Sequence, residues 1–165
     1  MNKLYVITGP AGVGKSTISY ELGNRLDKSV VIEGDAIYNF FVGGRIKPWH
    51  DNAPLELFWN NCIYLINSYL ENGYDVVFNY IIKPNELKLL SDNFSKYDFS
   101  FICLMVDEDT IIKRDLMRPE DCQMKERSII LLNEFKDCNY DSKYIIDTSN
   151  LTIDETVLKI LNKDS

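Results

Sequence analysis

The stretch Gly9-Pro10-Ala11-Gly12-Val13-Gly14-Lys15-Ser16-Thr17 has the spacing G-x-x-x-x-G-K-[ST], which is typical of a loop that binds phosphate. A triphosphate needs several backbone N–H donors pointing inward at once, and glycine gives the backbone that freedom without a clash at Cβ. In this pattern the Lys15 ammonium reaches the β- and γ-phosphates, and the Ser16 hydroxyl ligates Mg²⁺. The stretch therefore predicts a nucleotide-binding loop, with a helix behind it whose N-terminus completes the anion site.

The residues on either side of the loop support this interpretation. The segment 3–8, Lys-Leu-Tyr-Val-Ile-Thr, is short and rich in β-forming residues, which predicts a buried strand. After the loop, Ile18, Leu22 and Leu26 fall on one face of a helix. The alternative is a glycine-rich turn with a solvated lysine, but the strand before it and the helix after it disfavour a chance match.

Size and charge limit the class of protein and its partners. A length of 165 residues suits a single domain over 1–165 with one sizeable core. The net charge of −7 argues against a nucleic-acid or acidic-membrane partner, which would need a basic surface. A phosphate ligand stays compatible with this charge, because its site needs only local positive charge. We expect a monomer or homodimer that binds a small-molecule substrate.

Cysteine and histidine usage argues against several kinds of site. Cys62, Cys103, Cys122 and Cys138 form no C-x-x-C pair, which favours core thiols in a reducing cytosol over disulfides or a metal site. His50 is the only histidine, so a histidine-rich metal site or a Ser-His-Asp triad is not expected. No apolar run has the length of a membrane span and no signal-peptide pattern is present, so we expect a cytoplasmic protein.

Strand-like and helical segments alternate along the chain. We expect strands over 3–8, 30–35, 75–81, 99–106 and 144–147, and helices after the loop, over 36–42, 55–73, 84–96, around 114–118, over 125–135 and after 152. Thr152 and Glu155 form a capping box for the last helix. Four of the strands are apolar on both faces, as a parallel sheet covered by helices requires. The pattern predicts a three-layer α/β/α fold.

Asp35 follows directly after the second predicted strand. Ligands of open α/β sheets bind at the carboxyl ends of the strands. An acid there can hold the water shell of magnesium or accept the proton of an attacking hydroxyl. The alternative is that Asp35 is the N-cap of a helix that begins at Ala36, and the two roles are compatible.

Three arginines follow the fourth predicted strand. Arg114 and Arg118 are four residues apart and share a helix face, and Arg127 comes about two turns later. Guanidinium groups neutralise the charge of a transferring phosphoryl group. The alternative is a solvated face in which the arginines pair with nearby acids. We favour the phosphate role, because the segment lies where a closing flap would be.

The region 36–60 is the candidate acceptor-binding region. Its aromatic residues and one arginine are Phe40, Phe41, Arg45, Trp49, Phe58 and Trp59. A flat apolar substrate with an anionic or hydroxylated edge would suit a wall formed by Arg45 and Trp49 beside Asp35. For Phe58 and Trp59 we prefer a role in the core.

Two missing motifs narrow the class of nucleotide-binding protein. The D-x-x-G and N-K-x-D motifs that a GTPase needs are not found. The third predicted strand ends in Asn79-Tyr80, where motor and AAA-type ATPases usually carry an acid pair. Asp35 would then be the principal acid near the metal.

The order of the motifs resembles that of the small P-loop kinases, such as gluconate kinase, shikimate kinase, adenylate kinase and chloramphenicol phosphotransferase. The resemblance covers nearly the whole chain and rests on the phosphate loop, Glu33-Gly34-Asp35, Arg114-Asp115-x-x-Arg118-Pro119 and Asp147-Thr148-Ser149. It implies a five-stranded parallel sheet in the order 2-3-1-4-5 and a mobile helical lid over about 112–127. It also implies that Arg114 stacks on adenine, that Arg118 reaches the phosphates and that the segment after Asp147 lies near the adenine.

The sequence thus predicts an ATP- and Mg²⁺-dependent phosphotransferase that moves the γ-phosphate to a hydroxyl of a small molecule such as a sugar acid or cyclitol. Lys15, Asp35 and Arg118 are the expected catalytic residues, and Ser16 and Asp35 the expected metal ligands. Arg45 and Trp49 are expected to contact the acceptor together with Asp35. A kinase for an antibiotic or a nucleotide, and a nucleotide-binding regulatory module with little turnover, are the alternatives.

Overall fold

A five-stranded parallel sheet forms the centre of the molecule, in the order β2-β3-β1-β4-β5. The computed structural model describes residues 2–163, apart from the side chain of Cys122. The strands are β1 (Lys3–Thr8), β2 (Ser29–Glu33), β3 (Asp75–Asn79), β4 (Asp98–Met105) and β5 (Ile145–Asp147). The predicted α/β fold and its strand order are therefore confirmed.

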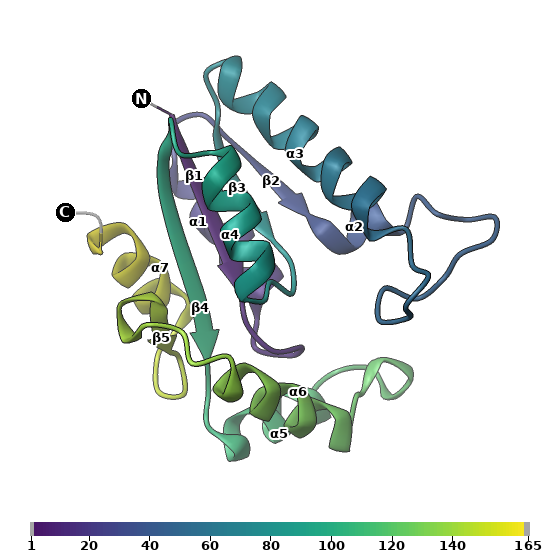
Figure 1. The fold of residues 1–165 in the computed structure, drawn as a ribbon. Helices are drawn as coiled ribbons and strands as arrows, with labels where there is room; N and C mark the ends of the chain where they lie inside the picture. Colours follow the sequence, from purple (N-terminus) through teal and green to yellow (C-terminus); the bar gives the residue numbers. More distant parts are fainter. Residues whose placement is uncertain (1, 164–165) are drawn as a thin grey trace.

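Helices cover both faces of the sheet and give the molecule three layers (Figure 1). One face packs against α1 (Lys15–Arg25) and α7 (Ile153–Asn162), and the other against α3 (Leu55–Glu71) and α4 (Pro84–Asn93). The short α2 (Gly34–Tyr38) follows β2 directly. Helices α5 (Glu108–Leu116) and α6 (Glu126–Asp137) lie beyond the arrowheads of the strands in Figure 1. Two 3₁₀ turns, Glu120–Cys122 and Ser142–Tyr144, complete the described elements.

The central strand β1 is buried along its whole length. It pairs with β3 on one side and β4 on the other. Its side chains alternate between two apolar clusters, with Leu4 and Val6 on the α3 side and Tyr5 and Ile7 on the α1 side. The unbroken apolar pattern of the strand follows from this double coverage.

Several boundaries differ from the predicted ones because tertiary contacts end the elements. Helix α2 runs from Gly34 to Tyr38 and not over 36–42, because the backbone bonds after it tighten to three-residue turns: the N–H of Phe40 donates to the Ile37 carbonyl at 3.1 Å. The Tyr38 hydroxyl donates to the Ile46 carbonyl at 2.6 Å and ties the following loop to the helix. Strand β3 ends at Asn79, since the chain then crosses over β1, where the Ile82 N–H donates to the Thr8 hydroxyl at 2.9 Å. Helix α4 ends at Asn93, three residues early.

The capping box at the start of α7 is confirmed. The Thr152 hydroxyl accepts a hydrogen bond from the Glu155 N–H at 3.2 Å, and the Glu155 carboxylate accepts one from the Thr152 N–H at 2.8 Å. Among residues 2–163, no helix has the length and apolar character needed to cross a membrane.

All the strands end at one edge of the sheet because they are parallel. The loop 9–14 leaves β1 there, α2 leaves β2, and the chain enters α5 from β4. Segments that are far apart in the sequence are thereby gathered at one edge, where ligands of open α/β sheets bind.

We predict that Gly34→Ala destabilises the protein, because a Cβ at Gly34 would lie 2.5 Å from Cδ2 and 2.8 Å from Cβ of Tyr80, whose ring is buried in the core. Such overpacking lowers the free energy of unfolding by about 1–3 kcal/mol, as urea denaturation would measure. Gly43→Ala is the matched control, since nothing lies within 4 Å of its Cβ position. Equal stability of the two variants would contradict the close packing of α2 against Tyr80.

Candidate active site

The backbone of the loop between β1 and α1 requires glycine. Gly9, Gly12 and Gly14 have φ values of 143°, 83° and 104°, which side chains with a Cβ rarely adopt. Gly9 also passes so close to the Leu104 carbonyl of β4 that a Cβ would collide with its oxygen. The glycines identified from the spacing of the motif are therefore those that the turn needs.

The N-terminus of α1 faces the end of this loop. Gly14 occupies the N-cap position and has no side chain with which to cap the helix. The first turn, Lys15 to Ile18, carries no acidic residue, so the positive end of the helix dipole is not neutralised locally. Ser16 and Thr17 lie exposed in this turn. Free N–H groups at a helix N-terminus form an anion-binding site.

The Lys15 ammonium lies over the loop itself. It donates hydrogen bonds to the carbonyls of Gly9 and Pro10 at 2.9 and 3.1 Å. Burial lowers the pKa of Lys15 to about 8, against the opposing effect of the Asp35 carboxylate, and the Arg118 cation lowers the pKa further. The charged form of Lys15 is thus destabilised by burial and by Arg118 and stabilised by Asp35. An anion placed in the loop would stabilise the charged form and raise the pKa again.

Asp35 lies at the carboxyl end of β2, in the first turn of α2, and is exposed. The N-cap of this helix is Glu33, so the alternative in which Asp35 caps a helix starting at Ala36 is wrong. Only one strand, β3, lies between β2 and the strand that leads into the phosphate loop, because the sheet order is β2-β3-β1. Asp35 is therefore exposed at the same edge of the sheet as the phosphate loop.

Asp35 is part of the wall of a cavity of about 410 Å³. The cavity is lined by Asp35, Tyr38, Asn39, Arg45, Lys47, Pro48 and Trp49. The Arg45 guanidinium donates to the Asn39 side chain at 2.8 Å, which holds the loop after α2 against the helix. The lining therefore combines an acid from α2 with two cations and an aromatic ring from the loop that follows.

Trp49 connects this cavity to α6. The ring is 60% exposed, and the Arg127 guanidinium carbon lies 4.8 Å from the ring centre. The Lys47 ammonium lies 5.2 Å from the same centre. Both distances are within the range of cation–π contacts. The segment that follows α5 thus touches the loop that follows α2 across the mouth of the site.

Arg114 is anchored between the phosphate loop and the end of β5. Its guanidinium donates to the Val13 carbonyl at 2.9 Å and to the hydroxyl and carbonyl of Thr148 at 3.2 and 3.1 Å. Thr148 is itself tied to β4, because its N–H donates to the Met105 carbonyl at 2.8 Å. These contacts bring the arginine and the segment after Asp147 together at the phosphate loop.

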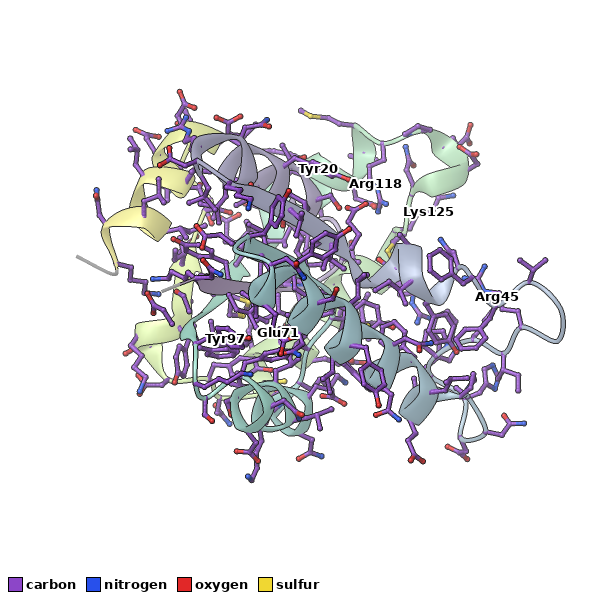
Figure 2. All side chains as sticks on the ribbon, turned by 90° about the horizontal axis from the view of Figure 1, so that it is seen from above. Tyr20, Arg45, Glu71, Tyr97, Arg118 and Lys125 are labelled. Carbon is purple, nitrogen blue, oxygen red and sulfur yellow. The ribbon has the colours of Figure 1, made fainter. Side chains whose placement is uncertain are left out.

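Asp115 joins α5 to the residues just before α6. Its buried carboxylate accepts hydrogen bonds from the N–H groups of Met124 and Lys125 at 2.9 and 2.7 Å and lies 3.6 Å from the Arg118 guanidinium. Burial raises the pKa of Asp115, but these N–H donors and the Arg118 charge outweigh it and lower the pKa. Figure 2 labels Arg118 and Lys125 on this segment and Arg45 on the loop after α2.

The oxygen donors near the loop fit a magnesium ion that is shared with a phosphate ligand. No group of three or more His, Cys, Asp or Glu side chains that could hold a metal is found in the described part of the chain. Mg²⁺ needs no such group, since it keeps several waters and binds through one or two protein oxygens together with substrate phosphates. The Ser16 hydroxyl and the Asp35 carboxylate are donors of that kind.

Several site residues were not identified from the sequence. Tyr38 and Asn39 follow Asp35 by three and four residues, so the helical spacing was a usable signal. Lys47 is two residues from Trp49, but its place in the wall depends on how the loop folds back. The anchoring role of Thr148 spans 34 residues of sequence from Arg114 and has no local signal.

No protein-family model and no curated protein matches the chain. Among solved structures it is similar to a sugar kinase from Janibacter sp. HTCC2649, with 14% identity over 98% of this chain and 94% of that chain and a TM-score of 0.72. The Deinococcus radiodurans tunicamycin resistance protein has 18% identity over 100% and 96% of the two chains and a TM-score of 0.71. A gluconokinase from Sinorhizobium meliloti 1021 has 19% identity over 98% and 90% and a TM-score of 0.67. The chain therefore has the fold of the small P-loop kinases, as its sequence predicts.

Proposed function

We propose that the protein is an ATP- and Mg²⁺-dependent phosphotransferase that acts on a hydroxyl of a small molecule. The observation that carries this proposal is the pairing of two sites at one edge of the sheet. A glycine-rich anion loop with Lys15 lies beside a cavity of about 410 Å³ whose wall includes Asp35. Structural similarity to a sugar kinase and a gluconokinase supports the same class of reaction.

The donor half of the reaction belongs to the loop. Bound Mg–ATP supplies the phosphoryl group, and the metal neutralises part of its charge. The loop N–H groups and the Lys15 ammonium would hold the phosphates, with the Ser16 hydroxyl and the Asp35 carboxylate as metal ligands. Arg118 would stabilise the charge on the transferring group, and Arg114 would lie against the adenine.

The acceptor half belongs to the cavity. Asp35 would accept the proton of the attacking hydroxyl, directly or through the metal shell. Arg45 and Lys47 favour an acceptor with an anionic or strongly hydroxylated edge, and the Trp49 ring favours an apolar face such as that of a sugar or cyclitol. A sugar acid meets these requirements.

We infer a lid over about 112–127 that excludes water during transfer. Arg127 contacts Trp49, and the Asp115 contacts keep the segment 117–125 in one piece, so the segment could move as a unit over both half-sites.

A kinase for an antibiotic shares this mechanism, and similarity to the tunicamycin resistance protein is a reason to test such acceptors. A regulatory module that only binds nucleotide would have no use for an acid in the cavity.

The proposal is tested by ADP release from the purified protein with ATP, Mg²⁺ and a panel of sugar acids, cyclitols, nucleosides and aminoglycosides. At least one acceptor is expected to raise ADP release well above the rate with ATP alone. Lys15→Met should lower that rate by about 10²-fold or more, because a charged donor aimed at developing charge is lost. Nucleotide binding without turnover for any acceptor would favour the regulatory module.

The lowered pKa of Lys15 predicts a pH dependence of ATP binding. Bound phosphate favours the charged amine and raises its pKa, so binding takes up a proton at a pH above the free value of about 8. ATP affinity should therefore fall as the pH rises above about 8. Calorimetry at pH 8.5 in buffers of different ionisation enthalpy measures the uptake. Lys15→Arg, which keeps its charge, should show none, and undiminished uptake in that variant would assign it to another group.

Asp35→Asn should lower turnover by about 10²–10⁴-fold, the range for loss of a positioned proton acceptor. Affinity for ATP should stay within a few-fold, because the loop N–H groups and Lys15 remain. Asp51→Asn is the matched control, since it removes an exposed acid from the same region outside the cavity wall. Equal turnover of wild type and Asp35→Asn with an accepted substrate would refute the role of Asp35 as base or metal ligand.

A further inference from the structure

Asn79 is the last residue of β3 and is buried, with 4% of its surface exposed. Its side-chain nitrogen donates no hydrogen bond within residues 2–163. One other buried side-chain nitrogen in this part of the chain also donates none, Nη1 of Arg118, and it lies 3.6 Å from the Asp115 carboxylate. A buried N–H group without an acceptor is unfavourable and therefore rare. Asn79 Nδ2 is thus a buried donor without an acceptor among the described residues.

The sheet places Asn79 between the two half-sites. Its register partners are Ile7, two residues before the phosphate loop, and Glu33, two residues before Asp35. Side chains alternate along β3, and Val77 lies in the cluster with Ile18 and Leu22 of α1. Asn79 therefore lies on the α1 face, at the edge of the sheet where the chain leaves β1 for the phosphate loop.

The chemistry of an amide at this position differs from that of a carboxylate. Nδ2 is a donor, so it needs a ligand atom with a lone pair, and a phosphate oxygen is a strong acceptor. A carboxylate in the same place would add negative charge beside the phosphates, whereas the amide adds none. Asp35 already supplies one acid, directly after the neighbouring strand β2.

We propose that Asn79 donates a hydrogen bond to the terminal phosphate of a bound nucleoside triphosphate, and so favours the triphosphate over the diphosphate. This role rests on the proposed nucleotide binding at the loop. The terminal phosphate is the one that lies towards the acceptor cavity, and Asn79 sits on the strand between the loop and that cavity. The loop N–H groups and Lys15 would already hold the β-phosphate, so the donor of Asn79 is assigned to the terminal phosphate.

Binding without turnover tests the assignment. Calorimetry would compare a non-hydrolysable ATP analogue with ADP for wild type, Asn79→Asp and Asn79→Leu. Asn79→Asp keeps the shape and turns the donor into an acceptor, and Asn79→Leu removes both. Each should bind the analogue about 10- to 100-fold more weakly, the range for a hydrogen bond to a charged group, and ADP within about three-fold. The exposed Asn24→Asp on α1 is the matched control and should change neither affinity.

Thermal unfolding gives a second readout. Asn79→Leu removes an unpaired buried donor, so the ligand-free variant should melt at or above the wild-type Tm, and the ATP analogue should raise its Tm less than it raises that of wild type. If Asn79→Leu does not fold, Asn79→Asp carries the binding test alone.

The outcomes separate this inference from the proposed function. Wild type that binds neither nucleotide refutes the proposed function. Wild type that binds both, with variants that leave the analogue affinity unchanged or weaken analogue and ADP equally, overturns the role of Asn79 and leaves it a structural residue satisfied by water.

Discussion

The site depends on how the chain leaves β1. The strand is buried on all sides, so its continuation must turn at once over the carboxyl end of the sheet, and Gly9 does so in contact with the Leu104 carbonyl of β4. Only a backbone without a Cβ can pass there. The turn brings α1 back over the sheet with its N-terminus at the loop. The conformation of the phosphate loop is therefore required by the packing of the chain as well as by ligand binding. The sheet sets the position of the loop relative to β2 and β4.

Three other segments complete the site because parallel strands end at a common edge. Asp35 lies in the short helix after β2, Asn79 at the end of β3 and Arg114 in the helix after β4. The contacts that hold the segments around the site are of different kinds. Arg114 is fixed by hydrogen bonds to backbone carbonyls, whereas Arg127 and Trp49 meet through a ring face. The rigid contacts lie on the donor side, and the more adaptable ones lie at the mouth of the acceptor cavity.

The fold and the phosphate loop could be predicted from the sequence because their signals are local. Apolar strands such as β1 alternate with amphipathic helices, and the motif contains the glycines that the turn requires. The cavity wall was predictable only in part. Lys47 joins it because a loop folds back onto α2 through the Tyr38 hydroxyl. Beside the phosphate loop, Thr148 holds Arg114 although the two residues are 34 positions apart. Such contacts depend on tertiary structure and have no periodicity. The unpaired state of Asn79 belongs to the same class, since it depends on what surrounds the end of β3.

The pKa of Lys15 has a chemical consequence beyond phosphate binding. An amine whose pKa is lowered to about 8 has a larger neutral fraction at pH 7 than an ordinary lysine has. Only the neutral amine is a nucleophile. In the ligand-free protein, Lys15 is therefore set apart from the solvent-exposed lysines as a target for amine-directed electrophiles such as aldehydes and activated esters. An anion bound in the loop would restore the charge of Lys15 and suppress this reactivity. The rate at which Lys15 is modified would therefore show whether the loop holds an anion.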